Sequence, residues 1–262
     1  MKVSIIQLST VPGDKAATIG KAVHRLNECQ GSDLVVLPEL WNIGFMNFDA
    51  YHREAEDKNG PTLTALTAAA KQTGAWVHAG SLVERVNEKF YNTSFLISPE
   101  GRIVSEYRKI HLFGYQSRET QLLDPGEALS VIRTPFGVIG MATCYDLRFP
   151  ELFRKMVDQG TEIFIVCAAW PQVRLSHWRL LTQVRALENQ CFLLAAGAAG
   201  VDHGIPYAGH SSVTDPSGQT VVQANMEEAV LQCDLDLKTV TEIRSAFPVL
   251  ADRKAWCVGP RS

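Results

Sequence analysis

The amino-acid sequence predicts an α/β fold in which two mixed sheets pack together and helices cover their outer faces. Three features of the sequence indicate this fold. Short continuous apolar runs, such as residues 34–37, are typical of strands that are buried on both faces. Apolar residues at helical spacing, as in residues 14–29, alternate with such runs in the first part of the chain. Turn sequences between β-rich runs, such as residues 98–101, indicate hairpins further along the chain.

Strands and helices alternate in the first part of the chain. Residues 3–9 alternate in polarity and predict a strand, whereas residues 14–29 predict an amphipathic helix. After the buried strand at residues 34–37, a helix is expected to begin at Pro61 and to end at Gly74. The other strands expected in this part are residues 76–83, 91–97 and 103–107.

The second half of the chain predicts two more helices within a series of strands. The helices are residues 151–160 and residues 177–189, and the tail from residue 236 is expected to be partly helical. Residues of the second helix that are spaced for burial are Trp178, Leu181, Val184 and Leu187. The expected strands are residues 130–133, 138–142, 162–168, 191–196, 211–214, 220–223 and 229–235. Because no linker or low-complexity segment interrupts this pattern, we expect residues 1–262 to form a single domain.

Composition and charge argue against several classes of function. The formal net charge is −3, and no basic cluster indicates a nucleic acid or an anionic membrane as a partner. The N-terminus lacks the pattern of a signal peptide, and no apolar run is long enough to span a bilayer. The six cysteines are scattered without a CxxC pair, so we expect them to be reduced thiols. These observations predict a cytoplasmic protein.

One cysteine lies where a buried strand ends and a helix is about to begin. The apolar run 138–142 precedes Cys144, and Pro150 suits the first turn of the next helix. Ligands bind at such strand ends in α/β folds, and nearby peptide dipoles can lower the pKa of a thiol. Asp146 and Arg148 follow, so the surroundings are not uniformly apolar. Cys144 is therefore the candidate nucleophile, although a free cysteine is more often a small buried hydrophobe.

Two ionisable residues follow other predicted strands. Glu39 comes after the strand at residues 34–37, and Lys109 comes after the strand at residues 103–107. Taken alone, each is more often a solvated surface charge. Together with Cys144 they would supply a carboxylate that accepts the thiol proton and an ammonium that holds a tetrahedral oxyanion. Whether the three side chains meet in space is left open by the sequence.

The segments around these residues resemble the signature sequences of the nitrilase superfamily of carbon–nitrogen hydrolases. The three signature blocks are, in order, Leu37-Pro38-Glu39, Tyr107-Arg108-Lys109-Ile110-His111-Leu112 and Cys144-Tyr145-Asp146-Leu147-Arg148-Phe149-Pro150-Glu151. Three further blocks agree, namely Ala169-Trp170-Pro171, Arg185-Ala186-Leu187-Glu188-Asn189-Gln190, and Gly209-His210-Ser211 with Asp215-Pro216-Ser217-Gly218. The resemblance runs from residue 3 to about residue 250, and six ordered blocks are far more specific than any one of them.

The resemblance implies a four-layer αββα sandwich with a Cys-Glu-Lys triad. On this interpretation Cys144 is the nucleophile and Glu39 is the general base and acid. Lys109 and the backbone N–H of Tyr145 would stabilise the oxyanion. Glu119 matches a second glutamate that many members carry, and it would orient Lys109 or the substrate. No metal or cofactor is required for such a reaction.

Within the superfamily, the sequence looks most like the omega-amidases, whose usual substrates are 2-oxoglutaramate and 2-oxosuccinamate. The segments that carry this likeness are the block around Cys144, Ala169-Trp170-Pro171 with His177-Trp178, and Phe247-Pro248. Such a substrate carries a carboxylate, for which an arginine is a suitable partner. The candidate arginines are Arg148, Arg174 and Arg118, although a salt bridge that braces the helix start is an equal alternative for Arg148. The aromatic candidates are Phe113, Tyr115 and Trp170, each of which could instead pack in the core or at an interface.

Partners and alternative functions follow from the same residues. We expect a small-molecule amide substrate and a homodimer, with the helix that contains Trp178 and the tail from residue 236 as interface parts. Within the superfamily, an N-carbamoyl amino acid amidohydrolase or another aliphatic amidase is the alternative. A Cys-His enzyme would use His111 or His210 as its base, but Cys144 lacks flanking glycines. A metalloenzyme lacks support because no HExxH or paired Cys/His spacing occurs. A non-catalytic binding protein on this fold is the alternative of a different class.

Overall fold

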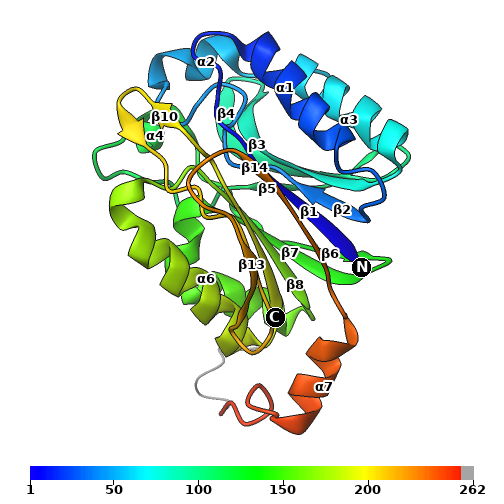
Figure 1. Cartoon of the computed structure of the whole chain (residues 1–262). Coiled ribbons are helices and arrows are strands. Elements are labelled where there is room, and N and C mark those ends of the chain that lie inside the picture. The colour runs from blue at the N-terminus through cyan, green and yellow to red at the C-terminus, as the bar shows by residue number, and fades with distance from the viewer. Residues whose placement is uncertain (255–262) are drawn as a thin grey trace.

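Two six-stranded mixed sheets pack face to face in the computed structural model, which describes residues 1–254 (Figure 1). The first sheet has the spatial order β14 (Ala229–Asp234), β1 (Lys2–Gln7), β2 (Leu34–Val36), β3 (Trp76–Val86), β4 (Lys89–Ile97) and β5 (Ile103–Arg108). The second has the order β13 (Thr220–Gln223), β12 (Ser212–Thr214), β9 (Phe192–Gly197), β8 (Ile163–Ala168), β7 (Gly137–Thr143) and β6 (Ser130–Thr134). The predicted pair of mixed sheets is confirmed.

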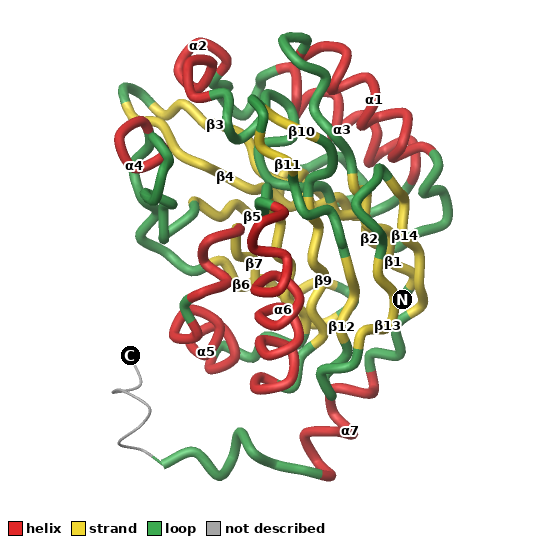
Figure 2. Tube along the Cα trace, turned by 60° about the vertical axis from the view of Figure 1, so that its left-hand side comes forward, coloured by secondary structure: helices red, strands yellow, loops and turns green. Residues whose placement is uncertain are grey.

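Helices cover the outer faces of both sheets. On one side lie α1 (Lys15–Asn27) and α3 (Pro61–Thr73), and on the other lie α5 (Pro150–Asp158) and α6 (Leu175–Asn189) (Figure 2). With the two sheets between them, these helices complete the four layers of an αββα sandwich. Local signals in the sequence fix where the helices begin and end. The Asp14 carboxylate accepts a hydrogen bond from the Ala17 N–H, and Pro61 opens α3, which ends at the left-handed Gly74.

Each sheet has three parallel strands at its centre and antiparallel strands around them. In the first sheet β1, β2 and β3 are parallel, and in the second sheet β7, β8 and β9 are parallel. Their inward-facing apolar side chains, such as Ile5, Val36, Met141 and Ile165, form a fully buried core between the sheets. The carboxyl ends of these strands bring polar loops from both sheets to one end of the sandwich. That end is where ligands bind in comparable α/β arrangements.

Some elements differ from the sequence-based predictions. A short helix, α4 (Glu119–Leu122), lies where no helix was predicted, and neither α2 (Tyr51–Glu54) nor the hairpin of β10 (Val201–Asp202) and β11 (Ile205–Pro206) was predicted. In α6, Trp178 is fully buried as expected, but Val184 and Leu187 are 40% and 52% exposed. Helical spacing is the same for a stripe that faces the core and a stripe that faces outward, so it does not distinguish them.

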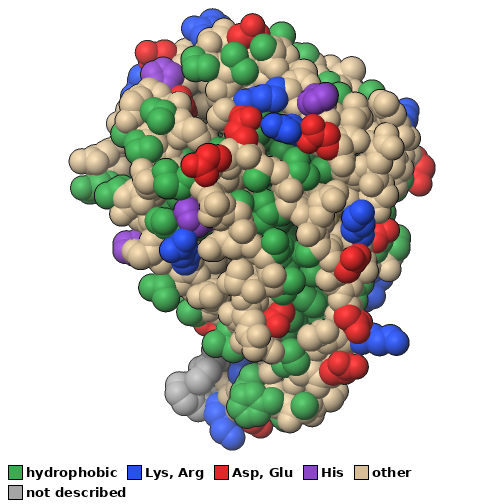
Figure 3. Space-filling model, viewed as in Figure 1, with side chains coloured by type: hydrophobic (Ala, Val, Ile, Leu, Met, Phe, Trp, Pro, Cys, Tyr) green, Lys and Arg blue, Asp and Glu red, His purple; other side chains and the backbone are tan. Residues whose placement is uncertain are grey.

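The C-terminal tail is partly helical, as predicted, with α7 at Lys238–Ala246. Residues 255–262, among them Cys257, lie outside the described residues. They include the end of the tail from residue 236 that was predicted to lie in an interface. Charges of both signs are interspersed on the face shown in Figure 3. Among residues 1–254, no helix combines the length and the hydrophobicity that crossing a membrane requires. That residues 1–262 form one domain stays a prediction.

Candidate active site

The structure brings Glu39, Lys109, Glu119 and Cys144 together where loops of the two sheets meet. Glu39 follows β2, Lys109 follows β5, and Cys144 follows β7 directly. Glu119 is the first residue of α4, which lies with the β10 hairpin and α6 on the left-hand side of Figure 1. Lys109 forms ion pairs with both glutamates, and Cys144 lies close enough to Glu39 for the charge of that carboxylate to raise the pKa of its thiol. The sequence placed three of these residues at strand ends but left their meeting open.

Lys109 joins the two carboxylates. Its Nζ donates to Glu39 Oε1 at 2.9 Å and to Glu119 Oε1 and Oε2 at 3.0 and 2.9 Å. All three side chains are fully buried. Burial alone would lower the pKa of Lys109, but the negative charges of Glu119 and Glu39 outweigh it and hold that pKa well above its usual value. These charges therefore favour the ammonium form of Lys109.

Glu39 is held in place by groups from both sheets. Its second oxygen, Oε2, accepts a hydrogen bond of 2.8 Å from the Ala169 N–H, at the end of β8. The turn that carries Glu39 packs closely on β3, where Gly80 has a φ of +64°. A Cβ atom at Gly80 would lie 1.9 Å from the Pro38 carbonyl oxygen, so no larger residue fits there without displacing that turn.

Cys144 occupies a strained turn between β7 and a short 3₁₀ helix (Cys144–Arg148). Its φ of +46° is left-handed, which costs a residue with a side chain roughly 1 kcal/mol. Thr143 and Asp146 compensate through a capping box, in which Asp146 accepts a hydrogen bond of 2.9 Å from the Thr143 N–H. Cys144 is 8% exposed and lies within range of the charge of Glu39.

Asp146 also connects the turn at Cys144 to the segment around Lys109, which follows β5. It accepts hydrogen bonds from the Tyr107 hydroxyl at 2.8 Å and from the His111 N–H at 3.0 Å, and these residues flank Lys109. The His111 ring pairs with Asp146 at 2.7 Å and stacks on Phe149 with centroids 3.8 Å apart. His111 is thus engaged in positioning the two loops. Buried Asp146 thus acts as a brace between the sheets.

The pKa of the Cys144 thiol is raised, whereas its place at a strand end suggested a lowered value. Burial is the largest cause, the charge of Glu39 adds to it, and Lys109 offsets part of the effect. Burial likewise raises the pKa of Glu119, although Lys109 opposes it. A nucleophilic role for Cys144 would therefore require a base that removes the thiol proton as the sulfur attacks.

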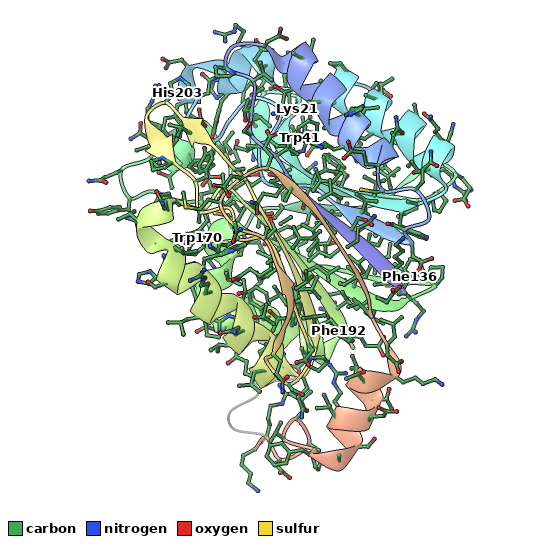
Figure 4. The ribbon with its side chains drawn as sticks, viewed as in Figure 1. Lys21, Trp41, Phe136, Trp170, Phe192 and His203 are labelled. Atoms are coloured by element: carbon green, nitrogen blue, oxygen red, sulfur yellow. The ribbon has the colours of Figure 1, made fainter. Side chains whose placement is uncertain are left out.

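The aromatic candidates lie around this cluster. The Phe113 N–H donates to Glu119 Oε2 at 2.7 Å, and the Phe113 ring packs edge-on against Tyr145 with centroids 5.1 Å apart. Trp170 follows the Ala169 that binds Glu39, and it lies beside α6 in Figure 4. It is almost fully buried, whereas Tyr115 is 61% exposed. Trp170 and Phe113 therefore adjoin the charged cluster, and Tyr115 lies at the surface.

The three candidate arginines have different surroundings. Arg118 forms an ion pair with Asp49 at 2.7 Å. Arg148 lies over the Trp170 ring at 4.8 Å and contacts His177. The alternative role for Arg148, a salt bridge that braces the helix start, is not found among the ion pairs of residues 1–254. Arg174 lies over the rings of Tyr115 and Phe113, at 5.4 and 5.8 Å, the distances running from the guanidinium carbon to each ring centre.

Sequence reasoning missed two groups that hold the carboxylates. Asn92 in β4 donates to both Glu39 and Glu119, and the Ala169 N–H donates to Glu39. The polar Asn92 within an otherwise strand-like run was the available signal, whereas a backbone N–H gives none. Of the histidines considered as bases, His210 contacts the Ala208 carbonyl oxygen at 2.6 Å through Nδ1.

Comparison with known proteins identifies the family of the chain. The sequence profile of the carbon-nitrogen hydrolases matches residues 2–245. The chain belongs to the carbon-nitrogen hydrolase family. The hydrolase is 38% identical to a 2-oxoglutaramate amidase of Paenarthrobacter nicotinovorans over 232 residues, which covers 86% of this chain and 79% of that protein. It is 35% identical to a 2-oxoglutaramate amidase of Bacillus subtilis strain 168, covering 95% of this chain and 96% of the relative.

A solved structure extends the likeness to the fold. A CN-hydrolase superfamily protein from Xanthomonas campestris superposes on the hydrolase with a TM-score of 0.92 at 31% identity, covering 99% of both chains. These comparisons confirm the superfamily and the likeness to the omega-amidase subgroup predicted from the sequence. They also confirm the nitrilase-like sandwich.

Proposed function

We propose that this hydrolase is an amidase that releases ammonia from 2-oxo acid amides, with 2-oxoglutaramate or 2-oxosuccinamate as the substrate. The observation that carries the proposal is the fully buried Lys109, which joins Glu39 and Glu119 beside Cys144. The two relatives named 2-oxoglutaramate amidase support the choice of substrate. Burying charges at this density costs stability even when they are paired, and such clusters occur preferentially at functional sites, so a catalytic role accounts for them better than a purely structural one.

The proposed reaction has two halves. In the first, Cys144 attacks the amide carbon while Glu39 takes the thiol proton, which then goes to the departing ammonia. Lys109 and the backbone N–H of Tyr145 stabilise the oxyanion, and Glu119 holds Lys109 in place. A thioester remains on Cys144. In the second half Glu39 deprotonates a water molecule, which attacks the thioester and releases the carboxylic acid and the thiol.

Recognition of the substrate carboxylate is assigned to Arg148 and Arg174. Among residues 1–254, neither forms an ion pair with a carboxylate, and both lie against aromatic rings near the charged cluster. Arg118 already pairs with Asp49 and is the weaker candidate. A guanidinium held against an aromatic face is preorganised to bind a carboxylate through two hydrogen bonds. Phe113, Tyr115 and Trp170 would then line the path of the substrate.

The same proposal includes a homodimer in the cytoplasm. Trp178 itself is fully buried and does not take part in an interface. The outer face of α6 exposes Leu180, Val184 and Leu187, and Val173 precedes the helix with 83% of its surface exposed. Contiguous apolar side chains at a surface favour a partner, and a second copy of this chain is the partner that the family resemblance implies.

Ammonia release provides the test of this function. The hydrolase would be incubated with 2-oxoglutaramate, 2-oxosuccinamate and an N-carbamoyl amino acid. We expect ammonia from the two 2-oxo amides, and we expect Glu39→Gln to abolish it while His210→Ala retains it. Release only from the N-carbamoyl compound would overturn the substrate assignment. No ammonia from any short amide would favour a non-catalytic binding protein.

A further inference from the structure

One buried amide completes the charged cluster. Asn92 Nδ2 donates to Glu39 Oε1 and to Glu119 Oε1, both at 2.9 Å. The side chain is fully buried, and its Oδ1 has no hydrogen-bond partner among residues 1–254. A buried carbonyl oxygen without a partner destabilises the folded chain. The two donated bonds are therefore what this side chain contributes, and both go to carboxylates.

The bonds to Glu39 divide its two oxygens into different roles. Oε1 accepts from Lys109 Nζ and from Asn92 Nδ2, each at 2.9 Å. Oε2 accepts a hydrogen bond from the Ala169 N–H. Within residues 1–254, this is the only hydrogen bond to Oε2. Because a carboxylate oxygen has two lone pairs in the carboxylate plane, Oε1 is fully occupied and Oε2 keeps one open.

Glu119 is fixed by the same pair of donors. Its Oε1 accepts from Lys109 and from Asn92, and its Oε2 accepts from Lys109 and from the Phe113 N–H. Lys109 and Asn92 thus bridge the two carboxylates from two sides. One ammonium faces two carboxylates in a volume closed to water, so one excess negative charge remains when both are ionised. The two amide hydrogens of Asn92 are directed at that excess.

We propose that Asn92 is a positioning residue of the amidase, which occupies Glu39 Oε1 together with Lys109 and so directs the Cys144 proton to Oε2. The same amide holds Glu119 against Lys109, which keeps the ammonium fixed beside the reacting carbon. Asn92 itself does not touch the substrate. The inference rests on the proposed role of Glu39 as the base, and it adds which oxygen of Glu39 performs it.

Two variants of Asn92 separate donation from packing. Asn92→Leu keeps the volume and removes both donors, whereas Asn92→Asp keeps the shape and adds a third carboxylate. We expect kcat to fall about 10- to 100-fold in Asn92→Leu and further in Asn92→Asp, with KM changed by less than about three-fold. If Asn92 only fills space, Asn92→Leu would retain the kcat of the unmodified protein, and that result would overturn the inference.

The pH dependence of Cys144 alkylation gives a readout that a structural role would not move. The hydrogen bond from Asn92 lowers the pKa of Glu119, so its loss makes that carboxylate, which holds Lys109, harder to ionise. In Asn92→Leu the acidic limb of the iodoacetamide rate should move about one pH unit upward. An unmoved limb, with kcat also unchanged, would contradict the inference.

A matched control and a second active-site variant make the outcomes distinct. Asn189, at the end of α6, is also fully buried and donates to the Arg185 carbonyl oxygen at 2.9 Å, and its Oδ1 has no partner within residues 1–254. Asn189→Leu should lower the melting temperature and leave both the pH limb and kcat unchanged. If Glu39→Gln remains active, the proposed function itself fails. If Glu39→Gln is inactive while Asn92→Leu behaves as the unmodified protein, only the role of Asn92 fails.

Discussion

Replacing Lys109 by methionine would leave two buried carboxylates without their common cation. Lys109 contacts both Glu39 and Glu119 at 2.9 Å, and none of the three side chains is exposed. Removing one partner of a buried, hydrogen-bonded ion pair destabilises a protein by roughly 3–5 kcal/mol. Methionine has similar length and no charge, so packing contributes little to the change. We expect Lys109→Met to lose roughly 3–5 kcal/mol of the free energy of unfolding near neutral pH.

The loss should depend on pH in a defined direction. In the native protein Lys109 opposes the effect of burial on the pKa of Glu119, so its removal raises that pKa further. A carboxylate whose pKa is raised in the folded state binds more protons there than in the unfolded chain. Stability of Lys109→Met relative to the unmodified protein should therefore increase as the pH falls from about 8 toward about 5.

Urea unfolding at several pH values measures this difference. The double variant Lys109→Met/Glu119→Gln serves as the control, because it removes one of the two stranded charges while keeping the shape of the site. It should regain much of the stability at neutral pH and remain inactive. A destabilisation by Lys109→Met that is below about 1 kcal/mol, or that is the same at every pH, would refute the reasoning about a closed charged cluster.

Three further outcomes are expected. Arg174→Met should raise KM for 2-oxoglutaramate by about ten-fold or more, whereas Arg118→Met should leave it unchanged. The same KM in Arg174→Met as in the unmodified protein would show that Arg174 does not recognise the substrate. Light scattering should show that the unmodified protein is a dimer and that the double variant Leu180→Glu/Leu187→Glu is a monomer. A monomeric unmodified protein would contradict the proposed interface. Burial lowers the pKa of His78 to about 3, so stability should fall as the pH drops from about 6.5, where the unfolded chain gains its proton. His78→Leu should flatten that fall in acid unfolding curves, and an unchanged slope would count against a neutral buried histidine.

The sequence predicts most strands and helices of the fold well because the signals for them are local. The continuous apolar run that ends before Pro38 is long enough to mark a buried strand, and Pro61 and Gly74 bound a helix by their own backbone preferences. The exposed stripe of α6 could not be assigned in this way. Val184 and Leu187 have the spacing of core residues, and spacing does not say whether the chain itself or a partner covers them.

The candidate site could be predicted only in part, for a similar reason. Cys144, at the end of an apolar strand, is a visible irregularity in the sequence. The partners of Asn92 lie 53 and 27 residues away, and their approach depends on how β2, β4 and α4 are placed. The Ala169 N–H that binds Glu39 is a backbone group, so no residue type could reveal it. The raised pKa of the thiol likewise arises from burial beside Glu39, which is a property of the assembled site.

Trapping the acyl-enzyme tests the central claim most directly. The protein would be mixed with 2-oxoglutaramate, quenched in acid within one turnover and measured as intact protein and as peptides by mass spectrometry. We predict a mass increase equal to that of the substrate less ammonia, located on the peptide that contains Cys144, with no such increase in Cys144→Ala or Glu39→Gln. Ammonia release without any adduct on Cys144, or an adduct that forms equally well in Glu39→Gln, would contradict the proposed thioester mechanism.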